Sequence, residues 1–197
     1  MSHEQNILAT VADAILQPDA LAKASARRHQ HKVKRLHHHA FYCRDVEETR
    51  HFYEDILEFP LVSSMVVFED PVTGEKDPYC HLFFEIGDSS CIAFFDYPSM
   101  TKSLDFKAPS LFHHHIALAV DDDTVIAYYR ERLTAANIKF LEIDHGFCHS
   151  LYVADPNGLN VELTADTAVA EEFYLRSENL AHRDLEIWRK HRPVSAC

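Results

Sequence analysis

The sequence predicts an α+β fold with two tandem βαβββ modules and extra helices at both ends. Residues 35–98 read as strand, helix and three strands, and residues 111–165 repeat that order. Each unit opens with three histidines, in "LHHHAFYCRD" and "FHHHIALAVDD". A repeat of this kind indicates internal duplication. We therefore expect an N-terminal helical extension (1–34), a two-module domain (35–165) and a C-terminal helical tail (166–197).

The first module begins with a strand at "RLHHHAFYC" (35–43). Residues 45–59 form an amphipathic helix, for which Asp45 is the expected N-cap. Three strands follow at 61–70, 79–87 and 89–97, and the turn "DPVTGEKDP" separates the first two of them. These residues share one face of the helix: Val46, Thr49, Phe52, Tyr53, Ile56 and Leu57.

The second module has a strand at 111–120, a helix at 122–137, and strands at 138–144, 149–155 and 159–164. The turn "DPNG" joins the last two strands and places Gly158 where a positive φ is required. Outside the modules, residues 4–29 read as helix, broken at Pro18. The tail reads as helix up to Pro193 and should pack on the core or on a second subunit.

Composition excludes several classes of protein. The formal net charge of −12 disfavours binding to nucleic acid. No apolar run approaches the length of a membrane span, and the N-terminus does not resemble a signal peptide, so we expect a cytoplasmic protein. The five cysteines show no CxxC spacing, which argues against a disulfide framework and a zinc knuckle.

The two histidine runs can be aligned in two ways. An offset of 76 residues superposes the triplets and matches Phe52-Tyr53 with Tyr128-Tyr129. An offset of 77 instead matches His38 with His115 and fits the apolar pattern of the strands. A one-residue insertion at "DDD" would satisfy both. Side chains alternate between the two faces of a strand, so a whole triplet cannot face one site.

A carboxylate stands in an otherwise apolar strand near the end of the second module. Glu162 lies between Val161 and Leu163. An ionised Glu is costly in such a place unless it is paired or bound to a metal, or unless its face meets solvent. Together with His38 and His115 it makes a 2-His-1-carboxylate set, which leaves open positions on a divalent metal such as Fe(II) or Mn(II).

These motifs resemble the vicinal oxygen chelate superfamily, which includes glyoxalase I, fosfomycin-resistance proteins and extradiol ring-cleaving dioxygenases. The matching stretches are "HHAFYCRDVEETRHFYEDIL", "HHIALAVDD" and "YVADPNGLNVEL", within residues 35–165. The resemblance implies paired βαβββ modules that form a curved mixed sheet around a metal site, with metal ligands at His38, His115 and Glu162. It also implies that Ala93 stands where glyoxalase I and several lyases have a fourth ligand.

A further stretch, "IDHGFCHSLYVADPNGLNVE", resembles the extradiol signature. The resemblance implies that His145 and Tyr152 hydrogen-bond the bound catecholate and oxygen-derived species. The alternatives are an exposed loop histidine and a packed strand aromatic. The sequence also departs from that subtype, because "FDYPSMTKSLDFKAPSLF" lacks the additional catalytic histidine that such enzymes carry before the second metal-His strand.

We therefore expect a metal-dependent dioxygenase of the extradiol type that contains Fe(II), or else Mn(II) or another divalent ion. Its partners would be a small aromatic substrate and O₂, with no nucleic acid and no membrane, and it would form a homodimer. A metal-dependent lyase, isomerase or thiol transferase of the same fold is the alternative, and a drug-sequestering protein is another. The aromatic side chains available to line a site are Phe41, Phe83, Phe94, Phe95, Phe147 and Tyr152.

Overall fold

The computed structural model describes residues 33–69, 72–107 and 114–191. The helix predicted at 4–29 and His113 lie outside the described residues. The chain divides into two compact units. One unit, Lys34–Thr167, contains both modules; the other contains helix α6 (Ala170–His191). Among the described helices, none is long and apolar enough to cross a membrane.

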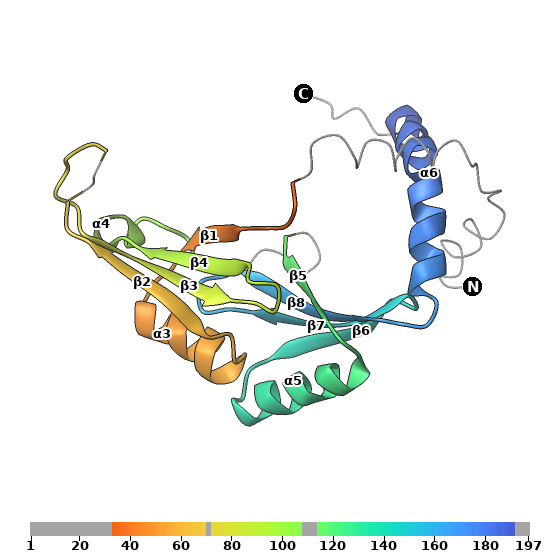
Figure 1. Ribbon diagram of the computed structural model, residues 1–197, viewed down its shortest axis with the longest axis horizontal. Coiled ribbons are helices and arrows are strands. Elements are labelled where there is room, and N and C mark those ends of the chain that lie inside the picture. The colour runs from red at the N-terminus through yellow and green to blue at the C-terminus, as the bar shows by residue number, and fades with distance from the viewer. Residues whose placement is uncertain (1–32, 70–71, 108–113, 192–197) are drawn as a thin grey trace. The chain divides into compact units, whose positions relative to one another are not determined.

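The first module, which we call module one, has the predicted element order (Figure 1). It contains β1 (His38–Tyr42), α3 (Val46–Arg50), the π-helix η1 (His51–Ile56), β2 (Leu61–Val67), β3 (Tyr79–Glu85) and β4 (Cys91–Asp96). The sheet order is β1-β4-β3-β2, in which β1 is parallel to β4 and the other pairs are antiparallel. A short helix that we did not predict, α4 (Pro98–Thr101), follows β4.

The second module, module two, repeats this plan. It contains β5 (Ile116–Val120), α5 (Asp123–Ala135), β6 (Phe140–Asp144), β7 (Cys148–Ala154) and β8 (Asn160–Asp166). The sheet order is β5-β8-β7-β6, again with one parallel pair at the edge. The predicted tandem βαβββ fold is thereby confirmed.

Equivalent aspartates begin the two module helices. Asp45 accepts hydrogen bonds from the backbone N–H groups of Glu47 and Glu48, and Asp122 accepts them from Thr124 and Val125. Both side chains satisfy N–H groups that have no partner within the helix. The first helix then widens, because Leu57 N bonds to Phe52 O, five residues back, at 3.0 Å. The prediction of a helix held, although its second half is π and not α.

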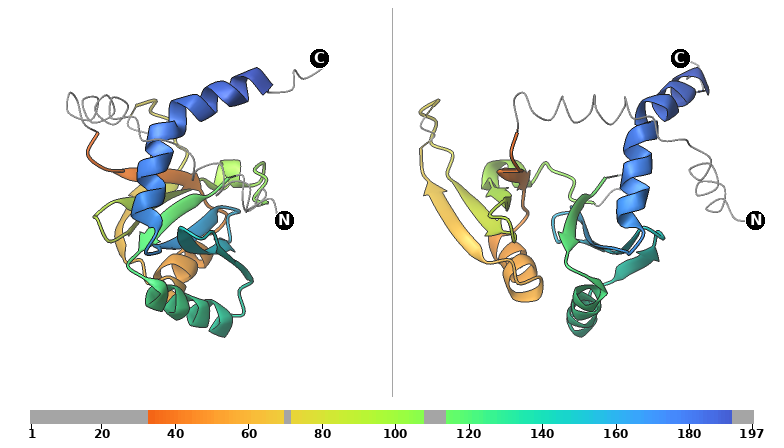
Figure 2. Two further views of the ribbon diagram at one scale, coloured as in Figure 1. Left: turned by 90° about the vertical axis from the view of Figure 1, so that its right-hand side faces the viewer. Right: turned by 45° about the vertical axis from the view of Figure 1, so that its right-hand side comes forward.

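Each sheet carries its helix on one face (Figures 1 and 2). Since strand side chains alternate, every second residue faces the helix and the core, and the others face the opposite side, which we call the open face. The largest fully buried side chains lie on helices or on the core-facing strand positions, and they include Tyr53, Leu57, Phe84, Ile92, Phe94, Ile126, Leu133, Leu151, Val161 and Leu163.

The two modules are tied together within their unit by the turn before β8. Tyr53 on η1 donates a hydrogen bond to Asp155 Oδ2 at 3.0 Å, and the backbone N–H of Arg44 donates to Asn157 Oδ1 at 2.8 Å. Gly158 has φ 81, as the "DPNG" turn predicted. Burial raises the pKa of Asp155, which four donors nevertheless stabilise as an acceptor.

The tail forms the predicted helix, α6, over Ala170–His191. Leu180 is buried, whereas Leu185 and Trp188 remain more than half exposed. The four described cysteines, Cys43, Cys80, Cys91 and Cys148, are all free, in line with the spacing argument.

Candidate functional site

Strand pairing decides which histidines are equivalent. Ala40 on β1 pairs with Ala93 on β4, and Ala117 on β5 pairs with Glu162 on β8. His38 and His115 each lie two residues before the paired alanine, so the offset of 77 residues is the structural one. The N-caps Asp45 and Asp122 follow the same offset, and no insertion at "DDD" is needed.

The open face of module two brings four of the predicted site residues into one hydrogen-bonded chain. His115 Nε2 lies 3.0 Å from Glu162 Oε2. The Tyr152 hydroxyl donates to the other carboxylate oxygen, Oε1, at 2.8 Å. His145 Nε2 lies 3.0 Å from the same hydroxyl. Because the phenol gives its one hydrogen to Glu162, the N–H of His145 must donate to the phenol oxygen.

Local backbone geometry delivers these side chains. Tyr152 and Glu162 are direct partners in the β7–β8 ladder, so their side chains leave the sheet side by side. His145 begins the β6–β7 turn, which closes with a bond from its own N–H to Cys148 O at 2.9 Å. Gly146 in that turn has φ 82, a conformation that suits a tight hairpin and that only glycine adopts without strain.

Burial sets the electrostatics of this chain. Glu162 is 6% exposed and Tyr152 is 4% exposed, while the His115 side chain is 29% exposed. Burial, and then the neighbouring Glu162 carboxylate, raise the pKa of Tyr152 well above its usual range. The phenol is therefore a neutral donor at physiological pH. His115 is the most exposed of the four groups and can meet a ligand, while His145 is half-buried.

The equivalent positions in module one have a different chemistry. Phe83 takes the place of Tyr152, and Ala93, which is fully buried, takes the place of Glu162. His38 therefore faces an aromatic ring, with centroids 5.5 Å apart, where His115 faces a hydroxyl and a carboxylate. Its Nδ1 instead lies 2.8 Å from Nδ1 of His37. Module one supplies no carboxylate equivalent to Glu162.

A histidine that the sequence analysis did not single out lies beside His38. His81 on β3 is 4% exposed, and its buried Nδ1 has no hydrogen-bond partner among the described residues. Its ring centroid is 6.3 Å from that of His38. Burial, and then the charge of His38, lower the pKa of His81. The alternation in "YCHLFFE" could have revealed it, since His81 and Phe83 share the face opposite Leu82 and Phe84.

The donor set fits a divalent metal in part. An imidazole nitrogen and a carboxylate oxygen are suitable ligands, and those of His115 and Glu162 converge on one place. Across residues 33–69, 72–107 and 114–191, however, no three His, Cys, Asp or Glu side chains come close enough to hold one ion. His38 lies on module one and does not join the other two ligands within the chain. The three-ligand site therefore stays a prediction.

Two of the aromatic residues proposed to line the site do not face it. Phe94 is fully buried in the core, where its ring lies 5.0 Å from that of Tyr53. Phe41 packs against Phe94 on the same side, with centroids 5.9 Å apart. Both occupy core-facing strand positions. Phe83, Phe95 and Tyr152 remain on the open faces.

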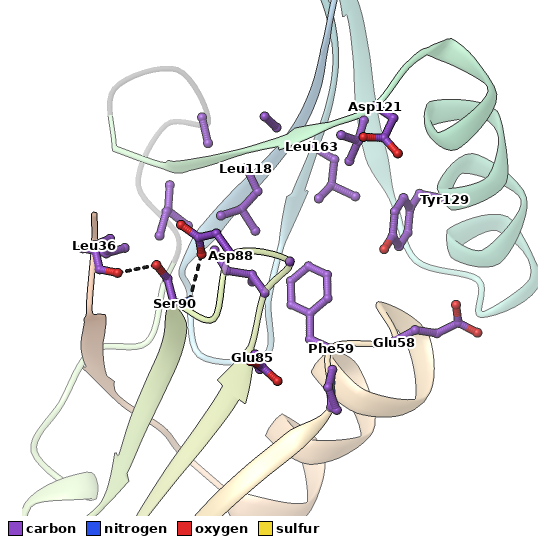
Figure 3. Close-up of a pocket in the computed structure, with 17 residues that line it drawn as sticks. Leu36, Glu58, Phe59, Glu85, Asp88, Ser90, Leu118, Asp121, Tyr129 and Leu163 are labelled. Atoms are coloured by element: carbon purple, nitrogen blue, oxygen red, sulfur yellow. Dashed lines mark hydrogen bonds between the residues drawn. The ribbon is translucent and has the colours of Figure 1, made fainter. Parts of the chain in front are cut away.

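A cavity of about 900 Å³ runs along the free edge of β5. Six consecutive residues, 116–121, line it from module two. Figure 3 shows Leu118 and Leu163 on one side of the cavity and Phe59 of module one on the other. Leu118 and Leu163 are paired core-facing residues, so this cavity lies on the face opposite Glu162.

Comparison with known proteins agrees with this architecture. The family model described as Glyoxalase/Bleomycin resistance protein/Dioxygenase superfamily matches residues 35–163. A glyoxylase/bleomycin resistance protein/dioxygenase domain from Frankia sp. EAN1pec is similar, with a TM-score of 0.55 and 14% identity, covering 73% of this chain and 99% of that one. The fosfomycin resistance protein FosX from Listeria monocytogenes, complexed with Mn(II), gives a TM-score of 0.51 and 20% identity, covering 72% and 99%. These likenesses to solved structures concern the fold.

Proposed function

The chain belongs to the glyoxalase/bleomycin resistance protein/dioxygenase superfamily, and from that premise we propose that it is a metal-dependent enzyme, specifically an extradiol-type dioxygenase acting on a catechol-like substrate. The observation that carries the proposal is the chain from His145 through Tyr152 and Glu162 to His115. It links two proton-bearing side chains to a pair of metal-type ligands. Such a linkage suits a reaction in which substrate hydroxyl groups lose protons beside a metal.

In this proposal His115 and Glu162 hold a divalent ion, and His38 is the third ligand. Fe(II) is the ion that we propose, because a 2-His-1-carboxylate set with open positions is typical of non-haem Fe(II) oxygenases. Mn(II) is the alternative, and the Listeria relative was solved with that ion. Ala93 is consistent with a three-ligand set, because the position equivalent to Glu162 in module one cannot coordinate.

His38 would come from a second copy of the chain. The strands that follow His38 and His115, β1 and β5, each form one edge of a sheet. Edge strands present unpaired N–H and C=O groups and are natural sites for pairing with another chain. In a two-fold dimer, module one of each copy would meet module two of the other, and two equivalent sites would form.

The chain's own groups would act as follows. When bound, the divalent ion supplies Lewis-acid activation of the substrate oxygens. Glu162 and His115 fix its place, and the Tyr152 hydroxyl keeps the carboxylate oriented through Oε1. His145, held by the turn at Gly146, donates its Nε2–H to the Tyr152 oxygen and can supply a proton there. The buried position of Tyr152 and Glu162 excludes water from that half of the site.

A metal-dependent lyase or isomerase is the second candidate. The observation that favours it is the likeness to FosX, which concerns the fold. Such an enzyme could use the same His115–Glu162 pair without O₂. A drug-sequestering protein of the same fold would need neither the metal nor the hydrogen-bonded chain, so the polar open face of module two counts against it.

Metal analysis of protein purified without oxygen, followed by oxygen-electrode assays with catechols, tests the proposal. We expect bound iron, oxygen uptake with a catechol, and loss of both in His115→Ala. Metal binding without oxygen uptake in any iron-loaded sample would sink the dioxygenase and favour the lyase or isomerase. Ligand binding that persists in metal-free His115→Ala would favour sequestration.

A further inference from the structure

Aromatic rings cover the open face of module one. We call this group of side chains, contributed by β3, β4 and the residue after β4, the aromatic face; its members are Tyr79, His81, Phe83, Phe95 and Tyr97. The rings contact one another closely: His81 lies 3.6 Å from Phe95 and 4.2 Å from Phe83, measured between centroids. Tyr79 and Tyr97 stack at 4.5 Å with an interplanar angle of 25°.

The aromatic face is continuous with the candidate metal histidine. The rings of His38 and Phe83 are 5.5 Å apart, and each further step toward Tyr97 is a ring contact of 6.0 Å or less. At the far end, α4 adds Met100, whose sulfur accepts a hydrogen bond from the Tyr42 hydroxyl at 3.8 Å. The run of rings is longer than a single benzene ring requires.

The fold alone does not require rings at these positions. Strand register makes Cys148, Ser150, Tyr152 and Thr164 of module two the equivalents of Tyr79, His81, Phe83 and Phe95. Module two fills its open face with small and polar side chains, such as Ser150, whose hydroxyl donates to Thr164 Oγ1 at 2.9 Å. The same sheet is therefore stable without an aromatic face, and its presence in module one calls for another reason.

Two properties indicate a ligand surface. Phe83, Phe95, Tyr79 and Tyr97 are each partly exposed. His81, by contrast, is 96% buried, yet its Nδ1 has no partner among the described residues. A buried polar atom without a hydrogen bond is costly and needs a partner. A polar substituent on a ligand would provide one when the rings that cover this atom move apart to admit it.

We propose that the aromatic face binds the planar aryl body of the substrate, a compound with two or more fused or linked rings and not a simple catechol. The assignment of this compound as substrate rests on the proposed function; its binding does not. Stacking and edge-to-face contacts with Phe95 and Tyr79 hold the distal ring, and the proximal ring lies beside His38 and Phe83.

Binding to metal-free protein separates this inference from the reaction. The probe is 2,3-dihydroxynaphthalene, followed by its fluorescence, with catechol as the single-ring comparison. We expect Phe95→Leu to weaken binding of the naphthalene probe about five- to tenfold, as for the loss of one to two aromatic contacts. Catechol binding should change by less than about twofold, because one ring does not reach Phe95. Phe68→Leu, at a ring that is 74% exposed, is the matched control and should have no effect.

Further variants keep the test decisive. Phe95→Tyr retains the ring and should bind the naphthalene probe as the unmodified protein does. Tyr79→Leu should weaken binding of the probe as Phe95→Leu does. Unchanged binding in both leucine variants would overturn the inference. So would a change in association state by sedimentation without a change in probe binding, because the face would then be a contact between copies. If Phe95→Leu takes up oxygen normally with both naphthalenediol and catechol, the aromatic face does not bind the substrate, although the dioxygenase proposal stands. If the protein binds the naphthalene probe selectively but takes up no oxygen, the aromatic face stands and the dioxygenase proposal fails.

Discussion

The two modules share one backbone plan and divide the chemistry between them. On the open face of module two, His115 meets Glu162, Tyr152 and His145. On the open face of module one, His38 meets rings and a buried alanine. The difference shows that after duplication the core-facing positions stayed apolar in both modules, while the open-face positions diverged. Proton transfer and two of the three proposed metal ligands would belong to module two, and the third ligand, His38, and recognition of an apolar substrate to module one.

The largest effect should come from removing the carboxylate that module one lacks. We expect Glu162→Ala to weaken divalent metal binding by more than about 100-fold and to abolish turnover. The loss should exceed that caused by mutating residues that only hydrogen-bond a metal ligand, which is about 10- to 100-fold. Metal titration by calorimetry measures this. Glu85→Gln on β3 of module one is the matched control and should bind metal normally. Equal affinity in Glu162→Ala and the unmodified protein would remove Glu162 from the site.

The reverse exchange tests whether module one can accept the chemistry of module two. Ala93 is fully buried at the position equivalent to Glu162, so Ala93→Glu buries a carboxylate that has His38 nearby but no hydroxyl like that of Tyr152 to hold it. We expect a loss of about 1–3 kcal/mol in the free energy of unfolding, typical of a buried polar group whose hydrogen bonds are incomplete. Urea denaturation measures it. Ala119→Glu, at an exposed position on β5, should change stability by less than about 0.5 kcal/mol. A stable Ala93→Glu variant would mean that the open face of module one is wetter than its rings indicate.

The sequence predicted those features of the two modules that depend on residues close together in the chain. The element order, the Asp45 cap and the Gly158 turn follow from periodicity and from backbone preferences of single residues, and all were confirmed. The equivalence of His38 and His115 could not be decided within the triplets, because it depends on pairing with strands more than 40 residues away. The π-helical turn at Leu57 depends on a shift of one hydrogen bond, which leaves no mark in the apolar pattern.

Within the candidate site, too, the sequence predicts contacts between neighbouring strands but not contacts between distant segments. Tyr152 and Glu162 are neighbours across one hairpin, so their contact follows from the turn between β7 and β8. His38 belongs to another sheet, and its distance from Glu162 depends on how modules or copies assemble, which no local pattern encodes. His81 was missed because alternation shows only that it shares a face with Phe83. Which face of β3 is open is known only once the side that carries the helix is known.

A single hydroxyl separates the equivalent rings of the two modules. Tyr152→Phe converts the site of module two toward the arrangement at Phe83 and removes the bond to Glu162 Oε1 and the contact with His145. We expect kcat to fall about 100-fold, at the lower end for loss of a proton-transfer group, and metal affinity to fall about tenfold. Stopped-flow turnover and calorimetry measure the two. Tyr129→Phe, whose hydroxyl donates to Leu57 O at 3.1 Å away from the site, should retain kcat. A fall in metal affinity without a fall in kcat would make Tyr152 a positioning residue.

The smallest effect concerns the exposed helix surface of module one. Arg50 pairs with Glu47, Glu54 and Asp55, and chiefly through its hydrogen bond to Asp55 it lowers the pKa of that carboxyl below its ordinary value. A carboxyl whose pKa is depressed on folding adds stability above its unfolded pKa, and that stability is lost as the pH falls toward the folded value. Arg50→Ala should therefore flatten the fall in the urea midpoint below about pH 4, where free Asp titrates. The change should be small, because exposed ion pairs are screened by solvent and by salt. The change in the pH profile should be smaller still in high salt. Arg130→Ala of module two should change the profile in the same direction, because Arg130 lowers the pKa of Glu142. A midpoint profile in Arg50→Ala that superposes on the unmodified protein at low salt would show that the surface pairs of module one contribute nothing to its fold.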